Sequence, residues 1–245
     1  MELQARQQVE INFWKYSPIE RPEADSLQVM LDKAIDASIF SDCLKPYAAV
    51  FNSAETILEL GAGQGWASCF IKRLCPTAFV TTTDISDWAL QSIHKWEYIY
   101  RVKIDETIAC KSYEIPKPDQ SIDLIFCFAA AHHFVAHRRT LQEISRVLKP
   151  NGHCYYFYEP SCLAFLYSLA HWRVNHKRPE VPEDVLIYPK IEAIARESGL
   201  VCTPNFYPHT FRRGGRETLY YMILSKLPYL QRLLPCSINY QFVKP

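Results

Sequence analysis

The chain has 245 residues, of which 49% are hydrophobic and 22% are charged. This composition is typical of a chain that buries a core, and it excludes disorder, collagen and simple repeats for the chain as a whole. The 27 basic and 26 acidic residues give a formal net charge of +1. Proteins whose affinity comes from neutralising phosphates usually carry a clear basic excess, so no nucleic-acid partner is expected.

The nine cysteines are odd in number and irregularly spaced, without the pairs that a zinc site requires. We therefore expect reduced core thiols and no metal site. Residues 1–14 carry charges and glutamines where a signal peptide has an apolar stretch, and no apolar run is long enough to span a bilayer. The predicted localisation is cytoplasmic.

Residues 1–55 are mostly helical in character. An aromatic-rich start is interrupted by Pro18 and Pro22, and apolar residues at helical spacing follow over residues 25–40. Asp25 or Ser26 is the expected N-cap of this helix. We expect residues 1–55 to form a helical cap in front of the main fold.

From Thr56 onward, apolar strands alternate with helices. Helices are expected between strands and end at signals such as Pro150 and Gly152. This alternation predicts βαβ units and a doubly wound, mostly parallel α/β sheet. The predicted strands of this part are residues 56–60, 79–84, 107–113, 121–130 and 153–159.

After Pro160 the pattern is interrupted by helical insertions. Helices are predicted over residues 161–178, 189–199 and 216–235. A sixth strand is predicted over 201–211 and a last one over 237–243. We expect a single domain over 1–245, with a cap at 1–55, a core at 56–160, and insertions and last strands on the substrate side at 161–245.

A glycine-rich turn gives the strongest functional signal. Gly61, Gly63 and Gly65 fall within five positions between a predicted strand and a predicted helix. Glycine there permits a tight turn and a close approach to a ligand. About twenty residues later the second strand ends at Asp84, whose carboxylate can accept both ribose hydroxyls. This pattern predicts a nucleoside site.

Two neighbouring residues favour one kind of nucleoside. A dinucleotide site needs a small residue where this chain has Trp66. Glu59 lies just before the turn, where a carboxylate would repel a pyrophosphate but could reach an ammonium group. Both features indicate a cofactor with an amino-acid end.

Four ordered motifs resemble those of class I S-adenosylmethionine-dependent methyltransferases. They are residues 59–65, residues 84–86, residues 121–125 followed by His132 and His133, and residues 148–153. The resemblance covers about residues 54–160 and, by strand order, the last strand. It implies a Rossmann-like sheet of seven strands with an antiparallel final strand, S-adenosylmethionine as cofactor, and methyl transfer from a sulfonium.

The resemblance also implies which residues hold the cofactor. The chain departs from the family at residues 111–116, where Glu114 does not occupy the usual acidic position, so Ser112 or Tyr113 is expected at the adenine. The full set of expected cofactor-binding residues is Glu59, Gly61, Ala62, Gly63, Asp84, Ile85, Ser112, Tyr113 and Phe128.

Catalytic candidates follow the fourth strand, at the ligand edge of the sheet. His133, by family position, and His132 could act as a general base for a hydroxyl acceptor, with helix capping or a local hydrogen bond as the alternative. Substrate contacts are expected from Trp14, Tyr16, Glu159 and Trp172.

The acceptor is expected to be a small molecule. Aromatic residues in the insertions favour O-methylation of an apolar, aromatic, or lipid- or carrier-linked compound, unless those helices pack on the sheet or form a homodimer face. The alternatives are an RNA or protein methyltransferase, a dinucleotide-dependent oxidoreductase, and a non-catalytic module.

Overall fold

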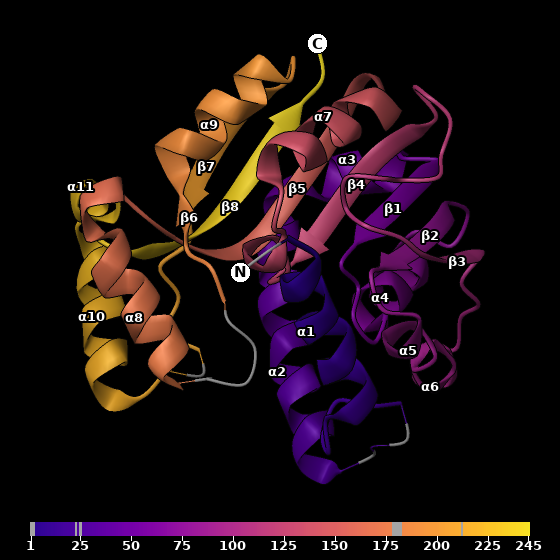
Figure 1. Ribbon diagram of the computed structural model, residues 1–245, viewed down its shortest axis with the longest axis horizontal. Helices are drawn as coiled ribbons and strands as arrows, with labels where there is room; N and C mark the ends of the chain where they lie inside the picture. The colour runs from indigo at the N-terminus through magenta and orange to yellow at the C-terminus, as the bar shows by residue number, and fades with distance from the viewer. Residues whose placement is uncertain (1–2, 23, 25, 178–182, 212) are drawn as a thin grey trace.

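The computed structural model describes residues 3–22, 24, 26–177, 183–211 and 213–245. Its centre is a twisted sheet in which seven strands follow the order β3-β2-β1-β4-β5-β8-β7 (Figure 1). Strands β1 to β5 are parallel, whereas β8 runs antiparallel to both β5 and β7. The strands are β1 (Thr56–Leu60), β2 (Phe79–Asp84), β3 (Glu106–Ala109), β4 (Ile122–Phe128), β5 (Leu148–Cys162), β7 (Val201–Phe206) and β8 (Cys236–Val243).

This arrangement confirms the predicted doubly wound, mostly parallel sheet with an antiparallel last strand. One further strand, β6 (Leu186–Ile187), was not predicted from the sequence; it pairs with the end of β5. Two residues are too few to show a period. The predicted third strand ends early, at Ala109, and the predicted fifth strand starts earlier, at Leu148.

Helices cover both faces of the sheet. One buried cluster joins the strands to α2 (Leu27–Leu44), α3 (Ala48–Ser53), α4 (Trp66–Leu74) and α6 (Ile93–Tyr100). Another joins them to α7 (His137–Val147) and α9 (Tyr188–Glu197). The helices of residues 3–147 are α1 (Leu3–Tyr16), α2 (Leu27–Leu44), η1 (Lys45–Tyr47), α3 (Ala48–Ser53), α4 (Trp66–Leu74), α5 (Asp87–Leu90), α6 (Ile93–Tyr100), η2 (Ala131–His133) and α7 (His137–Val147).

The helical insertions lie where the sequence predicts them, after β5 and between β7 and β8. The predicted helix over 216–235 is divided before Pro228, whose ring cannot continue a helix. Beyond residue 162 the helices are η3 (Ala164–Leu166), α8 (Tyr167–Lys177), α9 (Tyr188–Glu197), α10 (Gly215–Lys226) and α11 (Pro228–Gln231).

The N-terminal helices lie at the edge where the parallel strands end, and α8, α10 and α11 form a group beside them (Figure 1). The Ser26 hydroxyl caps α2 by accepting the Val29 N–H at 3.3 Å, so Ser26 is its N-cap. Asp25 lies outside the described residues. In the described part of the chain, no helix combines the length and the apolar character needed to cross a membrane.

Phe40 joins α2 to the sheet, and its replacement tests the core. The Phe40 side chain is fully buried, and its ring lies within 6 Å, centroid to centroid, of the rings of Trp66, Phe70, Phe126, Phe128 and Phe157. Phe40→Ala is expected to lower the free energy of unfolding by about 3–5 kcal/mol, because it leaves a cavity. Urea denaturation measures this loss. Leu31→Ala, at an exposed position of the same helix, is the control; equal losses in both variants would contradict the packing.

Candidate functional site

The glycine turn connects β1 to α4 and is held against the end of β2. Gly61 and Gly63 have φ values of +66° and +53°, in the region that favours glycine. The Gly63 N–H donates to the Asp84 carboxylate at 2.8 Å, and the Ala62 N–H donates to the Thr83 carbonyl at 2.9 Å. The predicted turn and the predicted acid are therefore in direct contact.

A cavity of about 150 Å³, here called the glycine-loop cavity, opens beside this turn. Helix α1 forms one wall, where Gln7 Nε2 donates to the Tyr113 hydroxyl at 2.8 Å. The strand ends and their loops form the other wall. Lining residues from the core include Gly61, Asp84, Ile85, Ser112, Tyr113 and Ala130, and those from α1 are Arg6, Gln7, Val9, Glu10 and Trp14.

Trp14 makes the approach to the turn especially close. A Cβ atom added at Gly63 would lie 2.8 Å from the Trp14 ring, which is closer than side chains normally approach. Trp14 Nε1 in turn donates to Glu10 Oε1 at 3.1 Å. Glycine at position 63 is thus required both by the backbone conformation and by the helix above it.

Three carboxyl groups lie at or beside this cavity, two of them buried (Asp84 and Glu59) and one, Glu10, with a side chain that is 20% exposed. Burial raises the pKa of Asp84 to about 6 although backbone N–H groups stabilise its charge. Burial and then repulsion from Asp84 raise the pKa of Glu10 to about 7. Burial raises the pKa of Glu59 to about 8, against the hydrogen bond that Ser68 donates to it. A cation in the cavity would favour the ionised form of all three groups.

A second cavity of about 340 Å³, here called the histidine cavity, adjoins the first. Ala129 and His133 line both cavities, so the two spaces meet there. Its lining combines apolar residues with charged and aromatic ones, and the polar and aromatic members include His132, Tyr158, Arg173, Glu183, Arg213, Glu217 and Tyr221.

Glu159 holds His132 at the rim of this cavity. The fully buried Glu159 carboxylate accepts the His132 Nδ1 proton at 2.8 Å and the backbone N–H groups of Ala130, Ala131 and His132 at 2.8–3.1 Å. Burial favours neutral imidazole, but the charge and hydrogen bond of Glu159 raise the pKa of His132 above its ordinary value. The Glu159 carboxylate therefore fixes the His132 ring by one contact and the backbone of residues 130–132 by three.

A distortion of β5 aims Glu159 at this loop. Tyr158 has a φ of +62°, and the pairing of β5 with β8 shifts register between Tyr156 and Glu159. Bulges of this kind redirect side chains and are common beside active sites. No local pattern in the sequence marks this irregularity.

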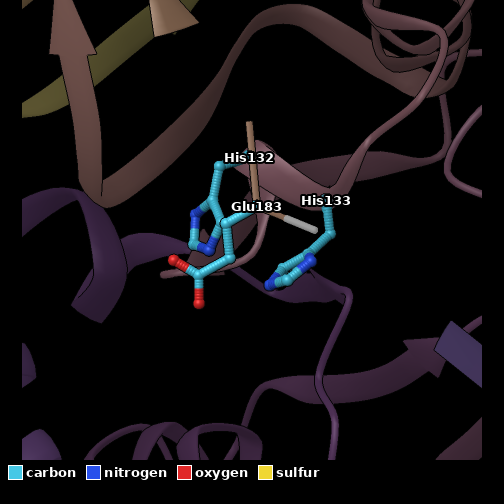
Figure 2. A group of neighbouring side chains, drawn as sticks. All are labelled: His132, His133 and Glu183. Atoms are coloured by element: carbon cyan, nitrogen blue, oxygen red, sulfur yellow. The ribbon is translucent and has the colours of Figure 1, made fainter. Parts of the chain in front are cut away.

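His133 occupies the junction of the two cavities. Its Nδ1 lies 3.4 Å from Glu10 Oε2 of α1, and its ring centroid is 4.3 Å from that of His132. Glu183, from the segment before β6, brings its carboxylate to the same place (Figure 2).

The structure brings most of the expected residues together. Gly61, Asp84, Ile85, Ser112, Tyr113, Trp14 and His133 line the glycine-loop cavity, and His132 lines the histidine cavity. Glu59, Ala62 and Gly63 lie in or beside the glycine turn, and Glu159 lies behind His132.

Three residues that were expected to contact the cofactor or the substrate lie outside the glycine turn and outside the described lining of both cavities. Phe128 packs in the aromatic cluster with Phe40 and Trp66. Tyr16 is 67% exposed at the end of α1, and Trp172 is 61% exposed and stacks on His176.

Sequence reasoning missed several residues of these cavities. Gln7 and Glu10 come from a helix that was expected only as a cap, and Arg173, Glu183 and Arg213 come from the insertions. A surface helix rich in polar residues carries the same sequence pattern as one that covers a cavity, so only the packing of α1 distinguishes them.

Comparisons with known proteins agree with this geometry. Residues 58–156 match the model of a methyltransferase domain family. An uncharacterized methyltransferase of Schizosaccharomyces pombe is 35% identical over 101 residues, which is 41% of this chain and 38% of that protein. The uncharacterized methyltransferase YcgJ of Bacillus subtilis is 28% identical over 134 residues, which is 54% of this chain and 52% of that protein. The chain thus spans about half the length, or less, of these curated relatives.

A solved structure supports the fold over the whole chain. The geranyl diphosphate C-methyltransferase of Streptomyces coelicolor A3(2) superposes with a TM-score of 0.68 at 12% identity, covering 100% of both chains. Together with the ordered motifs, these matches show a Rossmann-like methyltransferase fold. Residues 58–156 match a methyltransferase domain, and the comparisons together support a class I S-adenosylmethionine-dependent methyltransferase.

Proposed function

We propose that the chain transfers a methyl group from S-adenosylmethionine in the glycine-loop cavity to the hydroxyl of a small molecule in the histidine cavity. The observation that carries this proposal is the junction of the two cavities at Ala129 and His133. Methyl transfer requires donor and acceptor to be held close together and away from water.

The side chains around the glycine-loop cavity fit this cofactor. Asp84 is placed to accept the ribose hydroxyls, and the backbone of Gly61 permits close approach. Glu10 and Asp84 line the cavity and Glu59 lies beside it. Burial raises the pKa of all three carboxyl groups, and a bound cation lowers these pKa values, so the groups supply negative charge once the cofactor is present. When bound, S-adenosylmethionine supplies a methyl group on a positively charged sulfur.

The chain's own residues then have separate tasks. Helix α1 closes the cavity above the turn and excludes water, with Trp14 packed on Gly63. His132, oriented by Glu159, and His133 activate the acceptor hydroxyl at the junction. Tyr158 and Tyr221 provide aromatic surface for the body of the acceptor.

The proposal is tested by incubating the protein with S-adenosylmethionine and a library of small hydroxyl compounds, with mass spectrometry of the products. Enzyme-dependent gain of one methyl group on an oxygen is expected. Product formed only on nitrogen or carbon would contradict the hydroxyl acceptor, and cofactor binding without any product in the library or in cell extracts would contradict turnover.

Affinity for S-adenosylmethionine is expected to rise with pH up to about 8, the pKa of Glu59 in the cofactor-free protein. In the cofactor-free protein, burial raises the pKa of Asp84 to about 6 and that of Glu59 to about 8. A bound cation stabilises the ionised carboxylates and lowers both pKa values, so binding releases protons and becomes stronger as the pH rises toward the cofactor-free values.

Calorimetry in buffers with different ionisation enthalpies measures this proton release directly. Glu59→Gln removes one of the titrating groups and is expected to release fewer protons than the unmodified chain. Affinity that is independent of pH, with no proton release, would show that binding of the cofactor does not change the pKa of these carboxyl groups.

A further inference from the structure

Three potential metal ligands meet at the junction of the two cavities. One ring nitrogen of His132, one ring nitrogen of His133 and a carboxylate oxygen of Glu183 all lie within 4.8 Å of one another (Figure 2). We propose that these three side chains bind a divalent first-row transition-metal ion of the Zn²⁺ type, which holds the oxygen of the acceptor. This inference rests on the proposed function for the role of the ion, but not for its binding.

The ligand set matches this class of ion. Two imidazole nitrogens and one carboxylate are a common set for zinc in catalytic sites, where a fourth position stays open for water or substrate. Bond lengths of about 2.0–2.2 Å place such ligand atoms about 3.4 Å apart in a tetrahedral site. The ligand atoms lie within 4.8 Å of one another, so binding of the ion requires them to approach by up to about 1.4 Å.

The surroundings of His132 are those of a metal ligand. Metal-bound histidines usually donate their other ring N–H to a carboxylate, which fixes the ring. Glu159 accepts the Nδ1 proton of His132 at 2.8 Å, and the backbone N–H groups of residues 130–132 fix Glu159 in turn. Nε2 is therefore the nitrogen of His132 that remains to face Glu183 and His133.

His133 has a similar arrangement from another element. Glu10 of α1 places a carboxylate oxygen 3.4 Å from its Nδ1. A divalent ion at this site would thus lie near three carboxyl groups. Glu183 would be a ligand, whereas Glu159 and Glu10 contact the histidine ligands from behind. This excess of negative charge offsets a dication in a site that also receives a cationic cofactor.

The location indicates what the ion does. Glu183, His132 and His133 line the histidine cavity, and His133 also borders the glycine-loop cavity. A hydroxyl bound at the open position of a metal ion has a lowered pKa and carries more negative charge on its oxygen. The ion would therefore position the acceptor oxygen at the point where the cavities meet and lower the pKa of its hydroxyl, whose proton is lost to solvent water. With the ion bound, the two histidines act as its ligands and not as the base.

Calorimetric titration of chelator-treated protein with Zn²⁺ and with Co²⁺ tests the site without requiring turnover. One ion per chain is expected. His133→Ala and Glu183→Gln are each expected to weaken binding by at least about tenfold. His94→Ala, whose imidazole side chain is 75% exposed on α6, is the matched control and is expected to bind as the unmodified chain does.

The absorption of the Co²⁺ complex identifies the ligands. Nitrogen and oxygen ligands give only weak visible bands, whereas binding to any of the nine cysteines adds strong sulfur-to-cobalt bands in the near ultraviolet. Absence of stoichiometric binding, sulfur bands at one equivalent, or unchanged affinity in both His133→Ala and Glu183→Gln would each overturn the proposal. S-adenosylmethionine affinity is measured in the same samples, so that loss of the metal site is distinguished from failure of the cofactor site.

Discussion

His132→Ala is expected to lower the rate of methyl transfer by about a hundredfold to ten-thousandfold, the usual cost of losing a group that acts on a reacting proton. His132 is the histidine that Glu159 orients, and its ring faces the cavity proposed for the acceptor. Cofactor affinity is expected to change little, because His132 lines only the histidine cavity. His133→Ala is expected to lower the rate as well, since His133 borders both cavities.

Single-turnover rates and cofactor affinity, measured on the same protein samples, separate these effects. His94→Ala is the control for histidine removal, and the free energy of unfolding of each variant shows whether the fold is retained. If both His132→Ala and His133→Ala keep near-normal turnover on a hydroxyl acceptor, neither histidine activates it, and positioning alone accounts for transfer.

Asp84→Ala is expected to weaken S-adenosylmethionine binding by about 1–3 kcal/mol, the range for losing hydrogen bonds to a charged group. This corresponds to roughly five- to 150-fold in the dissociation constant. Asp84 lines the glycine-loop cavity and also accepts the N–H groups of Gly63 and Ser86 at 2.8 Å. The substitution therefore removes a contact to the ribose and loosens the turn at the same time.

Asp84→Asn keeps the size of the side chain and one of the two backbone hydrogen bonds, but its NH2 group faces the other backbone N–H, so a loss of affinity smaller than in Asp84→Ala is expected. Asp87→Ala removes an exposed carboxylate three residues away and is the control. Unchanged affinity in a folded Asp84→Ala variant, measured by calorimetry, would remove Asp84 from the cofactor site.

Local patterns predicted the parts of this molecule that depend on neighbouring residues. The glycine turn and Asp84 belong to one βαβ unit, β1-α4-β2, and the alternation of strands and helices is visible from each element to the next. Short-range spacing was therefore sufficient to predict them. Strand β6 was not predicted, because a strand of two residues is too short to show an alternation of apolar and polar side chains. The observed ends of strands differ from the predicted ends where pairing with an adjacent strand extends them. Strand β5, for example, begins at Leu148, which pairs with Ile122 of β4.

Of the residues around the two cavities, the sequence predicted mainly those that belong to the core at residues 56–160. Glu10 reaches the cavities through the packing of α1, and Glu183 through the path of an insertion, and neither contact involves residues close in sequence. The role expected for Glu159 was contact with substrate, whereas its carboxylate is turned toward His132 by the irregularity at Tyr158. Tertiary packing and local backbone distortion have no signature in a single sequence.

The ligand that the glycine-loop cavity binds decides what the chain does, and calorimetric titration with S-adenosylmethionine and, separately, with NADH identifies it. The geometry of Gly61, Gly63 and Asp84, with the carboxylates of Glu10 and Glu59 nearby, predicts saturable binding of one S-adenosylmethionine per chain and no binding of NADH. Saturable binding of NADH without binding of S-adenosylmethionine would show that the cavity is a dinucleotide site instead.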